Sequence, residues 1–141
     1  MNNFLDEIIS IEEYGIMDTI DIELTGDRLF YANDILTHNC GQNATDFELN
    51  EVSECVDPTG ILITKTGPKM LKDIEVGEQI MGSRGWVTVM IKHHPKIKKS
   101  YKITTKSGKT ILCSAEHQFP TNKGRLCINE GLVVGHMVKT L

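Results

Sequence analysis

The chain has 141 residues, 40% of them hydrophobic, which predicts one domain with a modest core. Its net charge of −4 argues against a surface dedicated to nucleic acid or to a membrane. No apolar stretch is long enough to span a bilayer, and the first ten residues lack the basic and apolar regions of a signal peptide. We therefore expect an intracellular protein of the reducing cytoplasm, where thiols stay reduced.

Short strands are the elements expected in the first part of the chain. Alternation predicts a strand over Thr19–Leu24, and an aromatic run predicts another over Leu29–Ala32. The pattern then breaks between Cys40 and Cys55. The intervening sequence GQNATDFELNEVSE is polar, acidic and poor in strand-forming residues. We expect this segment to be a linker or a passenger peptide outside the core.

Strand signals resume after Cys55 and continue through the second half of the chain. Strands are expected over Gly60–Thr64 and Trp86–Ile91, and a hairpin over 101–105 and 110–113. Helical periodicity is poor, and Met70–Ile74 predicts one turn at most. The predicted class is all-β, because strands this short and numerous do not form a parallel α/β sheet.

A basic run, KHHPKIKK, covers residues 92–99. We interpret it as a solvated loop, because local charge runs usually face water. The alternative is an electrostatic docking site for an acidic partner segment.

The four cysteines do not form a metal-binding or disulfide pattern. They are Cys40, Cys55, Cys113 and Cys127, with no CxxC pair and no histidine spacing that would complete a zinc finger. With zinc and disulfides disfavoured, a reactive thiolate becomes the hypothesis to test.

The tripeptide His38-Asn39-Cys40 combines groups that could cut and rejoin a chain. The Asn39 side-chain amide can attack its own backbone carbonyl and cleave the chain after itself. Cys40 is a nucleophile for acyl transfer, and His38 can move protons. Taken alone the tripeptide is weak evidence, since Asn39 could be a turn residue and Cys40 a small buried hydrophobe.

Cys55 opens the second block and could attack the carbonyl of Glu54, which would turn an amide into a thioester. This shift is uphill, so it needs a polarised amide and a group that protonates the departing nitrogen. Ser114 and His117, in the sequence SAEH, could supply a hydroxyl and an imidazole. Asp21 on an earlier strand could act as a general acid or base if it is buried. Taken singly, His117 could instead be an ordinary core or surface histidine, and Asp21 an edge-strand aspartate that faces water.

Taken together, these residues resemble the motifs of an intein, a self-splicing protein element, and most closely those of short phage-type split inteins. Inteins begin with a nucleophilic Cys, carry a Thr-x-x-His motif, place an acidic strand before an aromatic one, and end in His-Asn followed by Cys, Ser or Thr. The corresponding residues here are Cys55, Ser114 to His117 with Ser in place of Thr, Asp21 before Leu29–Ala32, and His38-Asn39-Cys40. Four motifs together are far more specific than any one.

Besides Ser114, which keeps the hydroxyl of the usual threonine but loses its methyl, two features depart from the family pattern. Arg28 stands where the family often has a histidine, so that catalytic role is not carried over. The order of the pieces is also reversed: residues 1–39 resemble the C-terminal intein piece, 40–54 an extein-derived linker, and 55–141 the N-terminal piece. Met1 and Leu141 would then correspond to the break point of a split intein.

The resemblance implies a Hedgehog/intein (HINT) fold, a horseshoe of many short strands in which 1–39 and 55–141 form one splicing domain. It implies protein splicing by an N-to-S acyl shift at Cys55, transthioesterification to Cys40 and cyclisation of Asn39. No cofactor, metal or nucleotide is required. The reaction would be a single-turnover autocatalytic event, and not the work of a turnover enzyme.

The resemblance also implies supporting residues. His117, helped by Ser114, would assist the acyl shift, Asp21 would manage the protons of the two thiols, and His38 would assist cyclisation. Ligation within one chain would give a cyclic peptide of residues 40–54.

The implied partners are the chain's own complementary piece and the flanking extein segments, with neither nucleic acid nor membrane. The pieces could pair within one chain or across a domain-swapped dimer. Two other functions stay open: a Hedgehog-type autoprocessing domain that stops at thioester cleavage, and an inactive β-rich binding module. The pair His38-Asn39 argues against the Hedgehog type, which needs no asparagine cyclisation.

Overall fold

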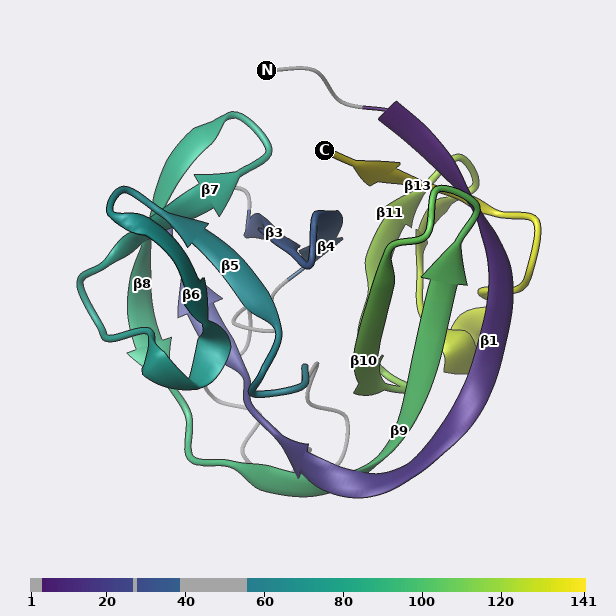
Figure 1. Ribbon diagram of the computed structural model, residues 1–141, viewed down its shortest axis with the longest axis horizontal. Coiled ribbons are helices and arrows are strands. Elements are labelled where there is room, and N and C mark those ends of the chain that lie inside the picture. Colours follow the sequence, from purple (N-terminus) through teal and green to yellow (C-terminus); the bar gives the residue numbers. More distant parts are fainter. Residues whose placement is uncertain (1–3, 27, 39–55) are drawn as a thin grey trace.

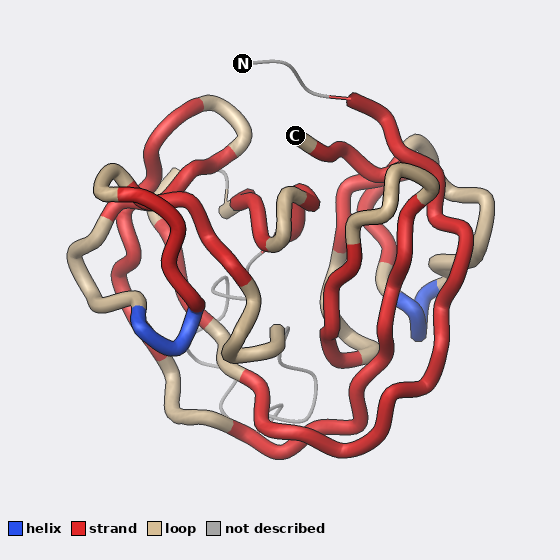
Figure 2. Tube along the Cα trace, in the orientation of Figure 1, coloured by secondary structure: helices blue, strands red, loops and turns tan. Residues whose placement is uncertain are grey.

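The computed structural model describes residues 4–26, 28–38 and 56–141. The strands in these ranges are linked by hydrogen bonds into one sheet, which curves round into a horseshoe with two arms (Figure 1). Helical structure in the described ranges consists of two 3-10 turns, η2 (Leu71–Asp73) and η3 (Ile128–Glu130). The prediction of an all-β class is therefore confirmed, and strands account for most of the trace in Figure 2.

The strands follow one another in short steps along the chain. In order they are β1 (Phe4–Thr19), β2 (Ile22–Leu24), β3 (Leu29–Ala32), β4 (Ile35–His38), β5 (Ile61–Thr64), β6 (Gly67–Met70), β7 (Gln79–Gly82), β8 (Gly85–Lys92), β9 (Lys96–Thr105), β10 (Thr110–Ser114), β11 (Phe119–Thr121), β12 (Gly124–Leu126) and β13 (Met137–Thr140). The strands predicted near 29–32, 60–64 and 86–91 and the hairpin at 101–113 are confirmed. So is the single turn at 70–74, as η2.

Strand β1 is the long element of the horseshoe. It pairs with β13 at its start and with β9 along the rest of its length. A register shift lies between Glu13 and Gly15, where Gly15 has φ +125°, a conformation open to a residue without Cβ. The predicted strand 19–24 is wrong in its extent, because β1 ends at Thr19 and β2 begins at Ile22. The chain changes partner there, from β9 to β8.

The basic run at 92–99 is only partly the loop that its charge predicted. Residues 93–95 are irregular, but Lys96–Lys99 belong to β9 and pair with residues 16–19 of β1. Strand pairing with β1 overrides the loop tendency of the charges, and Lys99 Nζ lies 3.0 Å from Glu13 Oε1 of that strand. Lys92 also belongs to a strand, since it ends β8, so the predicted loop is correct only for residues 93–95.

Strands β3 and β4 lie between the two arms (Figure 1). Their neighbours on both sides come from residues 55–141: Ala32 pairs with Leu62 of β5, and Ile35 pairs with Thr140 of β13. The buried apolar cluster likewise contains residues of both segments, including Phe30 from residues 1–39 and Leu62 from residues 55–141. The described parts of residues 1–39 and 55–141 therefore share one core.

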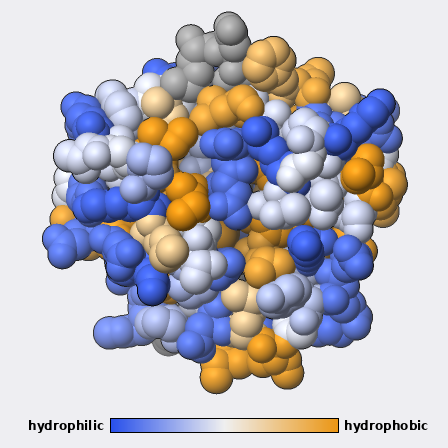
Figure 3. All heavy atoms as spheres, in the orientation of Figure 1, coloured by the Kyte–Doolittle hydropathy of each residue, from blue (hydrophilic) through white to orange (hydrophobic). Residues whose placement is uncertain are grey.

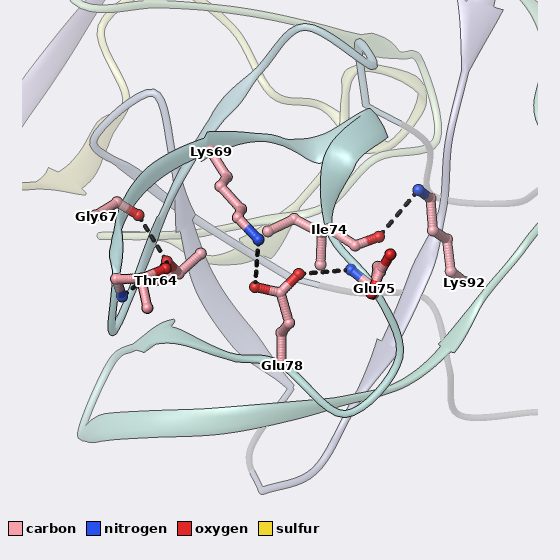
Figure 4. A network of polar contacts seen from close by, with 8 residues as sticks. Thr64, Gly67, Lys69, Ile74, Glu75, Glu78 and Lys92 are labelled. Carbon is pink, nitrogen blue, oxygen red and sulfur yellow. Dashed lines mark hydrogen bonds and ion pairs between the residues drawn. The ribbon is translucent and has the colours of Figure 1, made fainter.

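A polar network fixes the segment that follows η2 (Figure 4). Lys69 Nζ lies 2.8 Å from Glu78 Oε2, while Glu78 Oε1 accepts the Glu75 N–H at 2.8 Å. Lys92 Nζ donates to the Ile74 carbonyl at 3.0 Å. These contacts give the backbone groups of an irregular segment their partners.

The surface mixes polar and apolar residues on the face shown in Figure 3. Several large apolar side chains are exposed, with Ile16 at 76% and Ile97 at 71% the most open. Within the described ranges, no helix has the length and apolar character needed to cross a membrane.

Candidate functional site

Val56, the residue after the predicted nucleophile, is held between two segments of the fold. Ile20 donates its N–H to the Val56 carbonyl at 2.9 Å and accepts the Val56 N–H at 3.0 Å. Val56 also bridges to Cys113, and the next N–H, of Asp57, reaches the Leu112 carbonyl at 3.0 Å. Val56 is only 2% exposed. The backbone that follows position 55 is therefore fixed in place.

Asp21 and Ser114 each follow one of these partners of Val56. Asp21 comes directly after Ile20 and is 7% exposed, and its carbonyl accepts the His93 N–H at 3.0 Å. Ser114 comes directly after Cys113, ends β10 and is fully buried. The fold therefore brings both of these predicted site residues next to the bridge partners of Val56.

His117 lies in the turn that leaves β10. Its N–H donates to the Ser114 carbonyl at 3.2 Å, and the residue is 1% exposed. The ring packs edge-on against Phe119 at a centroid distance of 5.0 Å. Its Nε2 is hydrogen-bonded to the hydroxyl of Thr37 on β4. Packing and hydrogen bonding together define the orientation of the imidazole.

His38 ends β4 and is 3% exposed. Its N–H donates to the Gln118 carbonyl at 3.1 Å. Its Nε2 lies 2.9 Å from Nη1 of Arg125 on β12. Because a guanidinium has only donors, Nε2 must accept this bond. The neutral ring therefore carries its proton on Nδ1.

Residues 113 and 118, on either side of the turn that leaves β10, contact the described residues that flank the segment 39–55. Cys113, just before the turn, bridges to Val56, and Gln118 accepts the hydrogen bond from His38. The residues flanking the segment are thus both anchored on this short stretch of chain. Asn39, Cys40 and Cys55, which the sequence predicts as nucleophiles, lie outside the described residues, so their placement stays a prediction.

Two residues of this site were not predicted from the sequence. Thr37 contacts His117, and Arg125 contacts His38. The only sequence feature that pointed to Thr37 was its place directly before His38. No pattern pointed to Arg125, which is 87 positions from His38 in the chain. Arg28, at the place of the family's histidine, precedes β3 with φ +65°, and nothing in the structure explains the substitution.

The two described cysteines are poor nucleophiles. Burial raises the pKa of Cys113, which is completely enclosed. Burial, helped by a hydrogen bond to Glu130, raises the pKa of Cys127 to about 11. Both thiols are therefore protonated at neutral pH. Among described residues, no group of His, Cys, Asp or Glu side chains is arranged so that it could hold a metal ion.

No protein-family model and no curated protein matches the chain. Among solved structures it is similar to the crystal structure of the gp41-1 intein, with a TM-score of 0.56 and 30% identity over 63% of this chain and 80% of that chain. A triply substituted form of the same intein gives a TM-score of 0.55 and 30% identity over 61% and 78% of the two chains. These matches confirm the expected HINT horseshoe.

Proposed function

Because this chain belongs to the intein family of protein-splicing elements, we propose that it excises and ligates residues 40–54, with its two intein pieces in permuted order. The observation that supports this proposal is that the described residues on both sides of the segment 39–55 are anchored to positions 113 and 118, close together in the chain. His38 is hydrogen-bonded through its N–H to the Gln118 carbonyl, and Val56 forms a β-bridge with Cys113. Holding two reacting junctions together replaces a bimolecular encounter, which is worth a large effective concentration.

The first step in this proposal is an acyl shift at the Glu54–Cys55 peptide. The Cys55 thiolate attacks the Glu54 carbonyl carbon, the C–S bond forms, and the C–N bond breaks. His117 gives the departing nitrogen a proton, and Ser114 helps to polarise the amide. Consecutive Cα atoms are about 3.8 Å apart, so the fixed position of Val56 restricts where this peptide can be.

The second and third steps transfer the acyl group and release the other junction. The Cys40 thiolate attacks the thioester and expels the Cys55 thiolate, with Asp21 accepting and returning the protons of these thiols. The Asn39 side-chain nitrogen then attacks its own backbone carbonyl, closing a succinimide and breaking the Asn39–Cys40 bond. His38 activates this step by donating to the carbonyl from Nδ1. The freed Cys40 amine finally captures the acyl group from sulfur, which leaves an ordinary amide.

The proposed product is a cyclic peptide of fifteen residues, 40–54, with pieces 1–39 and 55–141 left as a complex. Fifteen residues span about 50 Å when extended, so one chain can close its own site. Short tethers give effective concentrations of about millimolar, which favours closure within one chain over a swapped dimer at low concentration. The reaction needs free thiols, which a reducing cytoplasm maintains.

Opposite charges support the pairing of the two pieces. Residues 1–39 contain one Lys or Arg and nine Asp or Glu, which gives a net charge of −8. Residues 55–141 contain fourteen Lys or Arg and six Asp or Glu, which gives a net charge of +8. The charges meet directly in the pairs Glu13–Lys99 at 3.0 Å and Asp34–Lys109 at 3.5 Å. The basic run at 92–99 thus fits the docking role that was the alternative to a solvated loop.

The test of this function separates its two cleavages. In Asn39→Ala, a small thiol should still cleave before Cys55, but no cut should occur after residue 39. In Cys55→Ala the pattern should reverse, because asparagine cyclisation does not need the thioester. Intact-mass measurements identify each fragment. Cleavage before Cys55 alone in the wild-type chain would indicate Hedgehog-type processing, and no cleavage would indicate a binding module.

A further inference from the structure

We propose that Thr37 and Arg125 are positioning residues through which each piece orients the histidine of the other. Thr37 belongs to residues 1–39 and contacts His117 of residues 55–141. Arg125 belongs to residues 55–141 and contacts His38 of residues 1–39. This inference rests on the proposed splicing function, in which His117 serves the first step and His38 the cyclisation.

The Thr37 hydroxyl is suited to fix the His117 ring. Thr37 is fully buried in β4, and its hydroxyl lies between Nε2 of His117 and the Gln118 carbonyl, 3.4 Å away. Phe119 meets the same ring at an interplanar angle of 79°. A hydrogen bond in such an enclosed place is stronger than one in water, and its loss is correspondingly costly. The position of the His117 imidazole therefore depends on β4 being in place.

Arg125 determines the hydrogen-bonding state of His38. Its Nη1 donates to Nε2 at 2.9 Å, so that nitrogen keeps its lone pair toward the guanidinium. The proton of the neutral imidazole is then on Nδ1, the tautomer that can donate to the Asn39 carbonyl. Without Arg125, Nε2 loses the donor that keeps its lone pair free of a proton. Arg125 is therefore a selector of tautomer as well as of orientation.

The two contacts are reciprocal, because each piece supplies a side chain that contacts the histidine of the other. Neither piece by itself holds its own histidine with all the contacts seen in the complete horseshoe. Both contacts form when β4 lies against residues 117–118 and β12. Cleavage is thereby linked to correct docking of the two pieces.

The experiment isolates each step within the full chain. The background Asn39→Ala with Cys40→Ala permits only thiol-induced cleavage before Cys55, and Cys55→Ala permits only cleavage after Asn39. Thr37→Val should slow the first reaction about tenfold, the effect of one buried hydrogen bond, and Thr37→Ser should restore it. Arg125→Met should slow the second reaction about tenfold while leaving the first unchanged, and Arg125→Lys should restore part of the rate.

Thr19→Val is the matched control. Thr19 is also buried, and its hydroxyl also crosses between the pieces, to the Lys96 carbonyl at 2.9 Å, but it contacts neither histidine. We expect this variant to lose stability without either selective rate effect. Nitrogen-15 NMR of the imidazoles gives a second readout: His38 should be the Nδ1–H tautomer in the parent background and lose that preference in Arg125→Met.

The possible failures are distinguishable. Thr37→Val and Arg125→Met reacting at the parental rates, or slowed no more than Thr19→Val, would overturn the positioning roles while leaving splicing intact. An unchanged His38 tautomer in Arg125→Met would overturn the role of Arg125. Parent backgrounds that cleave at neither junction would instead overturn the proposed function.

Discussion

Val56 and Ile20 exchange both of their backbone hydrogen bonds, at 2.9 and 3.0 Å, although they are 36 positions apart in the chain. This isolated bridge joins the two predicted intein pieces one residue after the proposed nucleophile. On its other side Val56 bridges to Cys113, beside Ser114. The backbone bridges of Val56 therefore reach Ile20, which directly precedes Asp21, and Cys113, which directly precedes Ser114.

Removing the Val56 donor should disable the first cleavage. In Val56→Pro the N–H that reaches Ile20 is lost, and the ring restricts the backbone at a buried bridge. We expect thiol-induced cleavage before Cys55 to fall at least about tenfold, as measured by intact mass. Val56→Ile keeps the N–H and the branched side chain, and should cleave at nearly the wild-type rate. Equal rates for the two variants would show that the bridge does not position this peptide.

Asp6 should make stability depend on pH. Burial opposes ionisation of Asp6, but hydrogen bonds from Ser107 and Thr105 and the charge of Lys109 outweigh it and lower its pKa below the usual 3.8. The unfolded state then binds the proton more tightly, so this stabilisation is complete above about pH 3.8 and is lost as the pH falls through the folded pKa.

Urea unfolding of Asp6→Asn beside the wild type measures this contribution. The difference in unfolding free energy should be largest at neutral pH and shrink as the solution is acidified below about pH 3.8. A difference that stays constant over that range would contradict the lowered pKa of Asp6.

Cys113 and Cys127 should resist alkylation in the folded chain. Cys113 is inaccessible, and the pKa of Cys127 is raised to about 11, so little thiolate is present near pH 8. Iodoacetamide labelling followed by peptide mapping should modify them only after unfolding. Labelling of Cys113 in native protein as fast as in denatured protein would contradict its burial.

Salt should weaken the association of the two pieces. Residues 1–39 and 55–141 carry net charges of −8 and +8, and exposed charges are screened beyond about 8 Å at physiological ionic strength. Titration of one synthetic piece into the other should give a slower association rate and a weaker affinity as potassium chloride is raised. Sucrose at matched viscosity serves as the control. An association rate independent of salt would rule out electrostatic steering.

Much of the fold and part of the site follow from local sequence. The hairpin of β9 and β10 was predictable because a turn signal separates two strand-forming runs. Asp21, His38, Ser114 and His117 were predicted by motif, and the structure buries all four. A pattern can detect the hairpin because it depends on neighbours in the chain, while the roles of these four residues in splicing stay predictions.

What escaped prediction depends on distant partners. Strand β1 was expected only at its end, because exposed apolar residues such as Tyr14 and Ile16 obscure the alternation. The strand is completed by pairing with β9, far away in the sequence. The contacts of Thr37 and Arg125 likewise exist only after folding, since they join residues 80 and 87 positions apart.

The most direct test of splicing is the mass of the peptide released from the wild-type chain in a non-thiol reductant, which cannot intercept the thioester. We predict a peptide of residues 40–54 that is one water lighter than the linear form, together with pieces 1–39 and 55–141. Release of the linear peptide alone, or a chain of unchanged mass in which Cys55 resists alkylation, would contradict splicing by this protein.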